Sequence, residues 1–208
     1  MDRIIEYLKE KYKPIGTIVY GSFSNGTNNQ NSDFDALVIY DGDEVVHDNS
    51  IVSGIELDVF VYPKSWFEKE YDIQDYIQIF NGIIINDDLG IIQKLKNEVE
   101  KQVLSYKPKS KEHNKQSIAW LEKMLKRTSR KDAEGLYRMH WLLVDSLEIY
   151  FDLIGKYYFG PKKAIKEMNE IDSKSADIYY NALKDPTDNN LTNWVKRLKD
   201  ILEKSEDK

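Results

Sequence analysis

Hydrophobic and polar positions in the first half of the chain alternate between helical and strand spacing. Four apolar residues near the N-terminus recur at helical spacing: Ile4, Ile5, Leu8 and Tyr12. They predict a helix that ends before Pro14. Three later segments, rich in β-branched and aromatic residues, predict strands at 15–20, 33–40 and 55–62. Asp41-Gly42 resembles the start of a hairpin turn, so we expect the second and third strands to be neighbours in one mixed or antiparallel sheet.

Helical spacing returns after the third strand. It covers residues 64–80 and 89–106, and the apolar segment 82–87 between them predicts a short strand. Together these elements predict an α/β (α+β) domain with a mixed sheet over residues 1–106. The segment 107–115 is polar and basic and contains Pro108, which is typical of a linker between domains.

The remainder of the chain predicts helices only. Their expected bounds are 116–129, 133–158, 161–171, 174–185 and 191–205. Most of them are amphipathic, but the second is apolar on nearly all sides, which indicates the most buried helix of a bundle. We therefore predict that an all-α helical bundle over residues 112–205 follows the α/β domain.

Composition narrows the range of partners. With 41% hydrophobic and 32% charged residues, the 208-residue chain is typical of a folded protein. Thirty basic residues against 36 acidic ones give a formal net charge of −6, which repels a polyphosphate backbone, so we expect no nucleic-acid partner. The lack of cysteine excludes disulfides and cysteine-ligated zinc.

The sequence predicts no membrane segment. Residues 1–13 are charged and helix-periodic, whereas a secretory signal needs an unbroken apolar run. The longest apolar runs are far shorter than the ~18 residues that a membrane-spanning helix needs. We therefore expect a cytoplasmic protein.

Two carboxylates stand one residue apart at the start of the second predicted strand. Residues i and i+2 of a strand point to the same side, so Asp33 and Asp35 are expected to project together. Parallel carboxylates repel each other unless one is protonated or a cation lies between them, and oxygen-ligated Mg²⁺ is the usual solution. The alternative is a solvated acidic strand start that holds no ion.

Asp58 offers a third carboxylate. It lies mid-strand between Leu57 and Val59, where an unpaired charge would be costly to bury. If the two strands are neighbours, three carboxylates converge on one or two metal ions, an arrangement that aligns an attacking oxygen with a leaving phosphate. Glu56 shares the face of Asp58 and would replace it in a different strand register.

A Gly-Ser turn follows the first predicted strand. Gly21 lets the backbone approach a ligand closely, and Ser22 offers a hydroxyl and an N–H group to a phosphate. The alternative is an ordinary turn between a strand and a helix.

These motifs, taken in order, resemble a known family. The segments GSFSNGTNNQNSDFD and ELDVF are similar to the nucleotidyltransferase superfamily that includes DNA polymerase β, and particularly to its small bacterial aminoglycoside and lincosamide nucleotidyltransferases. The resemblance is strong over residues 15–62 and implies that residues 1–106 form a nucleotidyltransferase domain.

The resemblance also implies roles for single residues. Asp33, Asp35 and Asp58 would be the catalytic carboxylates that hold Mg²⁺ or Mn²⁺, and Gly21 and Ser22 would bind the triphosphate of an NTP. Relatives often carry a basic residue in the Gly-Ser loop, where this chain has Asn25.

The Gly-Ser loop has no basic residue to bind the triphosphate, and the segment YYFGPKK offers two. Lys162 and Lys163 begin a predicted helix after Pro161, and we expect them to bind nucleotide across a cleft. The alternative is an exposed helix start, for which Pro161 at the first helical position is sufficient.

Other titratable residues are less specific. The three histidines, His47, His113 and His140, lack the spacing of metal ligands and are expected to be structural or exposed. Asp145 and Glu148 lie within the apolar helix. They could act as a base or bind a cationic substrate, or they could pair with Arg138 or with a neighbouring helix.

The expected reaction is metal-dependent transfer of AMP from ATP to a hydroxyl of a small molecule, such as an aminoglycoside-type antibiotic, with release of pyrophosphate. Asp58 would complete the metal site or accept the proton of the hydroxyl. The alternative is an antitoxin-like relative that modifies or binds a protein partner. An RNA-end nucleotidyltransferase is disfavoured by the acidic balance.

Overall fold

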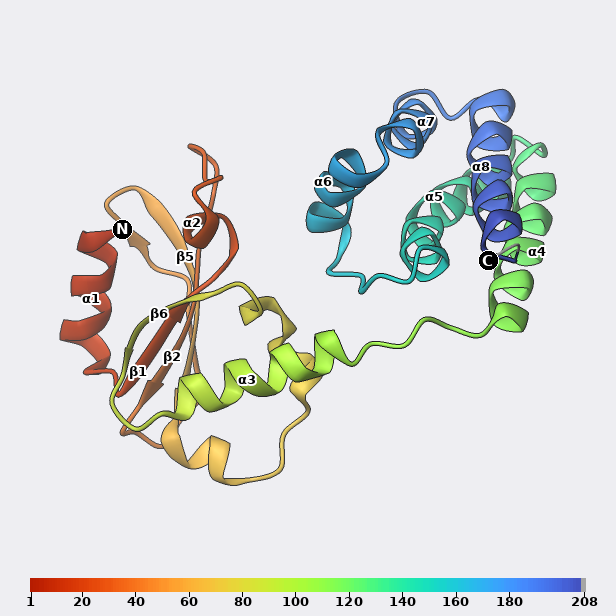
Figure 1. Ribbon diagram of the computed structural model, residues 1–208. Coiled ribbons are helices and arrows are strands. Elements are labelled where there is room, and N and C mark those ends of the chain that lie inside the picture. The colour runs from red at the N-terminus through yellow and green to blue at the C-terminus, as the bar shows by residue number, and fades with distance from the viewer. Residues whose placement is uncertain (207–208) are drawn as a thin grey trace. The chain divides into compact units, whose positions relative to one another are not determined.

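Six strands form one mixed sheet in the N-terminal part of the chain (Figure 1), in the order β3-β5-β2-β1-β6, with β4 paired to β5. The strands are β1 (Gly16–Val19), β2 (Phe34–Tyr40), β3 (Val46–Asp48), β4 (Ile51–Val52), β5 (Ile55–Pro63) and β6 (Ile83–Asp87). Neighbours β2 and β5 are parallel, and the other pairs are antiparallel. The mixed sheet predicted from the sequence is therefore confirmed.

The computed structural model describes residues 1–206. The chain divides into two compact units, and the division falls between Ser105 and Tyr106. We call them the N-terminal unit and the helical unit. Every helix within residues 1–206 is too short or too polar to cross a membrane.

Two helical layers cover the sheet of the N-terminal unit. Its helical elements are α1 (Asp2–Tyr12), α2 (Gly21–Asn25), the 3₁₀ helices η1 (Lys64–Glu68) and η2 (Ile73–Ile79), and α3 (Ile91–Leu104). Alternate residues of β2 serve the two faces: Ala36 and Val38 pack with α1, whereas Leu37 and Ile39 pack with α3 and η2. Figure 1 shows α1 and α3 on opposite sides of the sheet. Asp35 precedes Leu37 by two residues, so both side chains lie on the face of the sheet that α3 covers.

The connection between β2 and β5 differs from the expected hairpin. The chain passes through β3 and β4 before β5 returns parallel to β2, and β3 pairs antiparallel with the outer side of β5. Asp41-Gly42 therefore does not join the two expected strands directly. Residues 64–80 also differ, because the expected helix is two 3₁₀ helices, and the Asp72 side chain starts the second by accepting a hydrogen bond from the Gln74 N–H.

Asp48 anchors α1 to the sheet edge. The buried carboxylate accepts hydrogen bonds from the Tyr12 hydroxyl at 2.7 Å, the Lys11 ammonium at 3.0 Å and the Tyr7 hydroxyl at 3.2 Å. Burial opposes the charged form, but hydrogen bonds from Ser50, Tyr12 and Lys11 outweigh it and hold the pKa of Asp48 well below its usual range.

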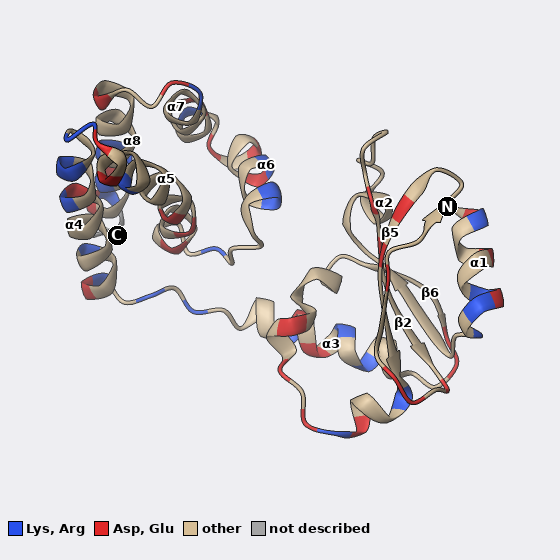
Figure 2. Ribbon diagram, turned by 180° about the vertical axis from the view of Figure 1, so that it is seen from behind, with Lys and Arg blue, Asp and Glu red and all other residues tan. Residues whose placement is uncertain are grey.

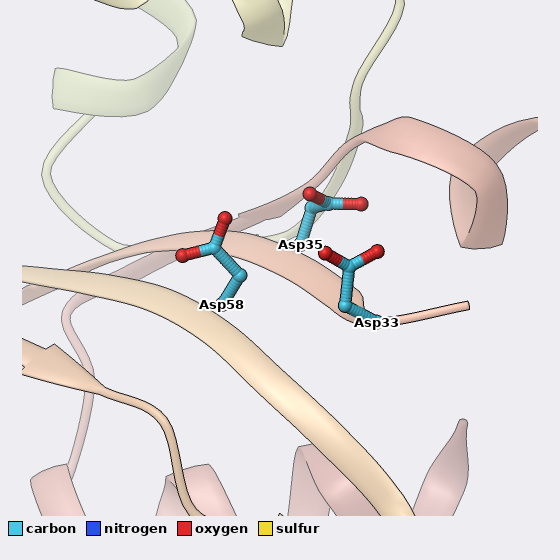
Figure 3. A group of neighbouring side chains, drawn as sticks. All are labelled: Asp33, Asp35 and Asp58. Atoms are coloured by element: carbon cyan, nitrogen blue, oxygen red, sulfur yellow. The ribbon is translucent and has the colours of Figure 1, made fainter. Parts of the chain in front are cut away.

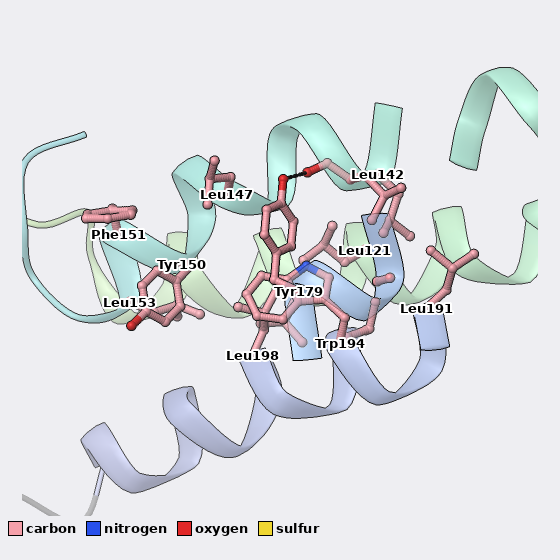
Figure 4. Packing of buried hydrophobic residues seen from close by; sticks show 14 of the residues in the cluster. Leu121, Leu142, Leu147, Tyr150, Phe151, Leu153, Tyr179, Leu191, Trp194 and Leu198 are labelled. Atoms are coloured by element: carbon pink, nitrogen blue, oxygen red, sulfur yellow. Dashed lines mark hydrogen bonds between the residues drawn. The ribbon is translucent and has the colours of Figure 1, made fainter. Parts of the chain in front are cut away.

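Five helices form the helical unit: α4 (Lys111–Thr128), α5 (Ala133–Leu153), α6 (Pro161–Ile171), α7 (Ser173–Lys184) and α8 (Asp188–Glu206). Trp194 is fully buried and donates a hydrogen bond to the Ser146 hydroxyl at 2.8 Å. Beside it, the Tyr179 hydroxyl donates to the Leu143 carbonyl (Figure 4). An α/β domain followed by helices, as the sequence predicts, is confirmed.

Two helix ends in the helical unit differ most from the expected bounds. The first helix, α4, begins at Lys111, inside the segment expected to be a linker, because the Ser110 side chain caps it by accepting from the His113 N–H. The next, α5, ends at Leu153 instead of residue 158, because Gly155 adopts a left-handed conformation with φ +71°.

Candidate active site

The strand register brings three carboxylates together. In the parallel pairing of β2 and β5, Asp35 lies directly opposite Asp58. Asp33 comes just before β2, two residues from Asp35. One carboxylate oxygen from each of the three lies within 4.8 Å of the others (Figure 3). Asp58 rather than Glu56 belongs to this group, although Glu56 lies on the same strand two residues earlier.

Gly21 lies against this group. It has a left-handed backbone conformation with φ +67°, and a Cβ atom there would lie 2.0 Å from Oδ2 of Asp35. The Tyr20 N–H donates a hydrogen bond to the Asp35 carbonyl at 3.1 Å, which fixes the turn to the start of β2. Any side chain at position 21 would therefore displace the Asp35 carboxylate.

Ser22 follows this glycine and is buried, with 4% of its surface exposed. Within the described part of the chain, its hydroxyl has no hydrogen-bond partner. A buried hydroxyl of this kind costs free energy unless a ligand or water satisfies it. The residues Gly21 and Ser22 thus combine close backbone approach with an unsatisfied polar group.

The pKa of Tyr20 is affected by the negative charge of the carboxylates. Burial raises the pKa of its hydroxyl well above the usual value, and the charges of Asp35 and Asp58 raise this pKa further. The three carboxylates therefore concentrate negative charge beside Tyr20.

His47 is the residue of this site that the sequence did not reveal. It lies on β3, and its Nε2 is 2.7 Å from Oδ1 of Asp58. The expectation that His47 is merely structural or exposed omits this contact. Because β3 has only three residues, no period in the sequence marks it as a strand, and the pairing with β5 could not be inferred.

A groove opens beside two of the carboxylates. It has a volume of about 530 Å³ and is lined by residues 30–33, His47, Asn49, Ile51 and residues 54–58. These residues include Asp33 and Asp58, together with Glu56. No lysine or arginine lies among these lining residues, so the groove favours a neutral or cationic ligand.

The donor set fits a divalent cation that prefers oxygen. Three carboxylates supply oxygens only, which suits Mg²⁺ or Mn²⁺ and not a metal that prefers sulfur or nitrogen. The hydroxyl of Ser22, which is unsatisfied within the described residues, adds a hydrogen-bond donor for an anionic group.

The remaining candidates are distributed over both units. Asn25 uses its side-chain oxygen within its own turn, where it accepts from the Thr27 N–H and hydroxyl. Lys162 and Lys163 begin α6 in the helical unit, and the Lys163 ammonium lies 5.3 Å from the centre of the Phe159 ring. His113 and His140 are exposed on α4 and α5.

The acidic residues of α5 have partners within the helical unit. Asp145 accepts a hydrogen bond from the Trp141 indole at 2.5 Å, and Glu148 lies 3.5 Å from the Lys109 ammonium. Arg138, the partner considered for them, instead binds Glu134 at 2.6 Å. A groove of about 470 Å³ beside Asp145 and Glu148 is also lined by Trp141 and Lys109.

The comparison with protein families agrees with the motifs. The family model of the nucleotidyltransferase domain matches residues 1–202. Among solved structures, a nucleotidyltransferase-like protein from Exiguobacterium sibiricum 255-15 is similar, with 13% sequence identity and a TM-score of 0.38, and the match covers 96% of this chain and 72% of that chain. None of the curated proteins matches this sequence. Because the family model spans nearly all of the described residues, the chain belongs to the nucleotidyltransferase domain family.

Proposed function

We propose that this nucleotidyltransferase is a metal-dependent enzyme that transfers AMP from ATP to a hydroxyl of a small molecule and releases pyrophosphate. The observation that carries the proposal is the convergence of Asp33, Asp35 and Asp58, whose ligand atoms lie within 4.8 Å of one another. Three carboxylates at this spacing, next to a glycine turn, suit a triphosphate with a bound divalent cation.

Each residue has a distinct part in the proposed reaction. Asp33, Asp35 and Asp58 hold Mg²⁺ or Mn²⁺, which when bound neutralises the phosphates and activates the acceptor hydroxyl. Gly21 lets the triphosphate approach the backbone, and Ser22 donates its free hydroxyl to a phosphate oxygen.

The transfer itself is a displacement at the α-phosphorus. The acceptor oxygen forms a bond to this phosphorus, and the bond from the phosphorus to the bridging oxygen of pyrophosphate breaks. The hydroxyl proton passes to Asp58 if this carboxylate is not a metal ligand, and to solvent water if Asp58 completes the metal site. Lys162 and Lys163 add positive charge for the triphosphate, because residues 21–39 contain no lysine or arginine.

The acceptor is expected to be a hydroxylated small molecule with amino groups, such as an aminoglycoside-type antibiotic. Support comes from the groove beside Asp33 and Asp58, which is lined by carboxylates and side-chain amides but by no lysine or arginine. A volume of about 530 Å³ lies within the range of small-molecule sites.

One experiment tests the proposal in two steps. Thermal shift of the purified chain with each NTP, in Mg²⁺, in Mn²⁺ and in EDTA, should show stabilisation by ATP only when a metal is present, because three carboxylates repel a bare triphosphate. Pyrophosphate release is then measured with ATP and a panel of hydroxylated amines. Equal stabilisation in EDTA, or no pyrophosphate with any acceptor, would contradict the proposal.

The second candidate is an antitoxin-like enzyme that modifies or binds a protein partner. A specific observation favours it, because Tyr137, Trp141 and Val144 follow one another on one face of α5 and are 66%, 40% and 67% exposed. Large apolar side chains gathered on a surface are typical of protein contacts. Mass spectrometry of a partner protein incubated with the chain and ATP separates the modifying form of this candidate from the small-molecule enzyme, because only the modifying form leaves the nucleotide on a protein side chain.

A further inference from the structure

The imidazole of His47 contacts the third carboxylate directly. Its Nε2 lies 2.7 Å from Oδ1 of Asp58. A carboxylate can only accept hydrogen bonds, so the tautomer that fits this contact is the one in which Nε2–H donates to Asp58. Because a carboxylate has two oxygens and about four lone-pair sites, Asp58 keeps capacity for a cation or for the proton of an acceptor.

The ring of His47 is held in place from the strand side. In the antiparallel pairing of β3 and β5, His47 lies opposite Phe60. The two rings stack with centroids 4.4 Å apart and planes within 7° of parallel, and Phe60 stacks in turn on Tyr62 at 6.5 Å. A row of three rings along the sheet therefore fixes the direction of the Nε2–H group.

This support matters because the contact is open to solvent. The side chains of His47 and Asp58 are 50% and 40% exposed. Exposed ion pairs contribute little when both partners are free to rotate. Here one partner is fixed by stacking and the other by its position opposite Asp35 in the sheet, so the contact can set the orientation of the Asp58 carboxylate.

We infer that His47 is a positioning residue that orients Asp58 toward the group formed with Asp33 and Asp35. The inference rests on the proposed role of Asp58 in holding a cation. Residues that hydrogen-bond to a ligating carboxylate or histidine fix its orientation, and the loss of such a residue commonly weakens metal binding. The competing explanation is that His47 only secures the edge strand β3 to β5.

Two substitutions separate the hydrogen bond from the stacking. His47→Phe keeps a ring that can stack on Phe60 but removes the donor, whereas His47→Gln keeps an N–H donor and removes the ring. Asp58→Asn tests the carboxylate itself. His113→Phe is the matched control, because His113 is exposed in the helical unit.

The main measurement is Mn²⁺ binding by electron paramagnetic resonance, with a nonhydrolysable ATP analogue present. We expect Asp58→Asn to weaken Mn²⁺ binding and His47→Phe to weaken it by about 10- to 100-fold, the usual effect of losing such a partner. His47→Gln should restore much of the affinity, and His113→Phe should equal the wild type. Urea unfolding of His47→Phe should match the wild type, because the stacked ring remains.

The outcomes separate failure of the inference from failure of the proposed function. If Asp58→Asn weakens Mn²⁺ binding but His47→Phe does not, the positioning role of His47 is wrong and the role of Asp58 stands. If Asp58→Asn binds Mn²⁺ as the wild type does, the proposed role of Asp58 fails, and the inference falls with it. If His47→Phe loses both Mn²⁺ binding and stability while His47→Gln restores neither, His47 only secures the strand.

Discussion

The α-carbon of Gly21 faces the Asp35 carboxylate so closely that a methyl group there would lie 2.0 Å from Oδ2. This relationship joins the turn after β1 to the group of three carboxylates. Position 21 requires glycine for two reasons: φ is +67°, and no space remains for a side chain.

We expect Gly21→Ala to abolish nucleotidyl transfer, because the new methyl group displaces Asp35. The matched control is Gly26→Ala, which has a similar φ of +71° but no atom within 4 Å of the added Cβ. Both variants should lose roughly 1 kcal/mol of stability from the positive φ. Pyrophosphate release and urea unfolding check this. Equal transfer by the two variants would show that the contact with Asp35 is unimportant.

Asp33→Asn and Asp35→Asn are each expected to abolish transfer. In the absence of nucleotide their thermal stability should equal or exceed that of the wild type, because each substitution removes repulsion between like charges. Calorimetry and pyrophosphate release measure the two effects. Asp43→Asn, which changes an exposed carboxylate in the loop after β2, serves as the control. Unfolding of both variants at room temperature would mean that the pair is structural.

Lys163→Ala is expected to raise the KM for ATP roughly tenfold, which is about 1.4 kcal/mol and close to the lower limit for loss of a charge-assisted contact. Lys162→Ala should show this effect instead if Lys162 is the residue that reaches the phosphates. Stability should barely change, because both lysines lie in the first turn of α6. Lys166→Ala on the same helix is the control. Wild-type nucleotide affinity in both single variants and in the double variant would limit α6 to acceptor or partner recognition.

The network around Asp48 predicts a pH dependence of stability. Because the pKa of Asp48 is lowered on folding, the carboxylate stabilises the fold at pH values above its ordinary pKa of 3.8, and this contribution is lost as the pH falls below about 4. Asp48→Asn should therefore be less stable than the wild type at pH 7 and should lose less stability between pH 4 and 2. Hydrogen exchange of peptides from α1 and β3 measures this. Parallel pH profiles would contradict the prediction.

Binding to single-stranded RNA or duplex DNA is expected to be negligible at physiological ionic strength. The net charge is −6, and α1 and α4 each carry both signs of charge (Figure 2). Phosphate contacts supply most of the affinity of nonspecific binding, and they need a continuous basic surface. A gel-shift assay that showed a submicromolar complex would favour an RNA-end nucleotidyltransferase.

Local signals account for what could be predicted from the sequence. The alternation of residues between the two faces of β2 and β5 is a property of each strand by itself. The strands, and the shared side of Asp33 and Asp35, can therefore be predicted from residue spacing alone. The parallel pairing of Asp35 with Asp58 depends on a contact between distant segments, so it could not be predicted from local spacing. The Asp41-Gly42 turn instead suggested a direct hairpin connection between the two strands. The contact of His47 with Asp58 could not be predicted, because it depends on the pairing of β3 with β5, which places His47 opposite Phe60.

Three buried clusters occur within residues 1–206, and each lies within a single unit: two around the sheet and one among α4–α8. The residues that must repack around a substitution at Trp194 therefore belong to the helical unit, and the interior of the sheet does not have to repack. Substitutions in the interior of the helical unit are therefore expected to leave the packing beside Asp33, Asp35 and Asp58 unchanged.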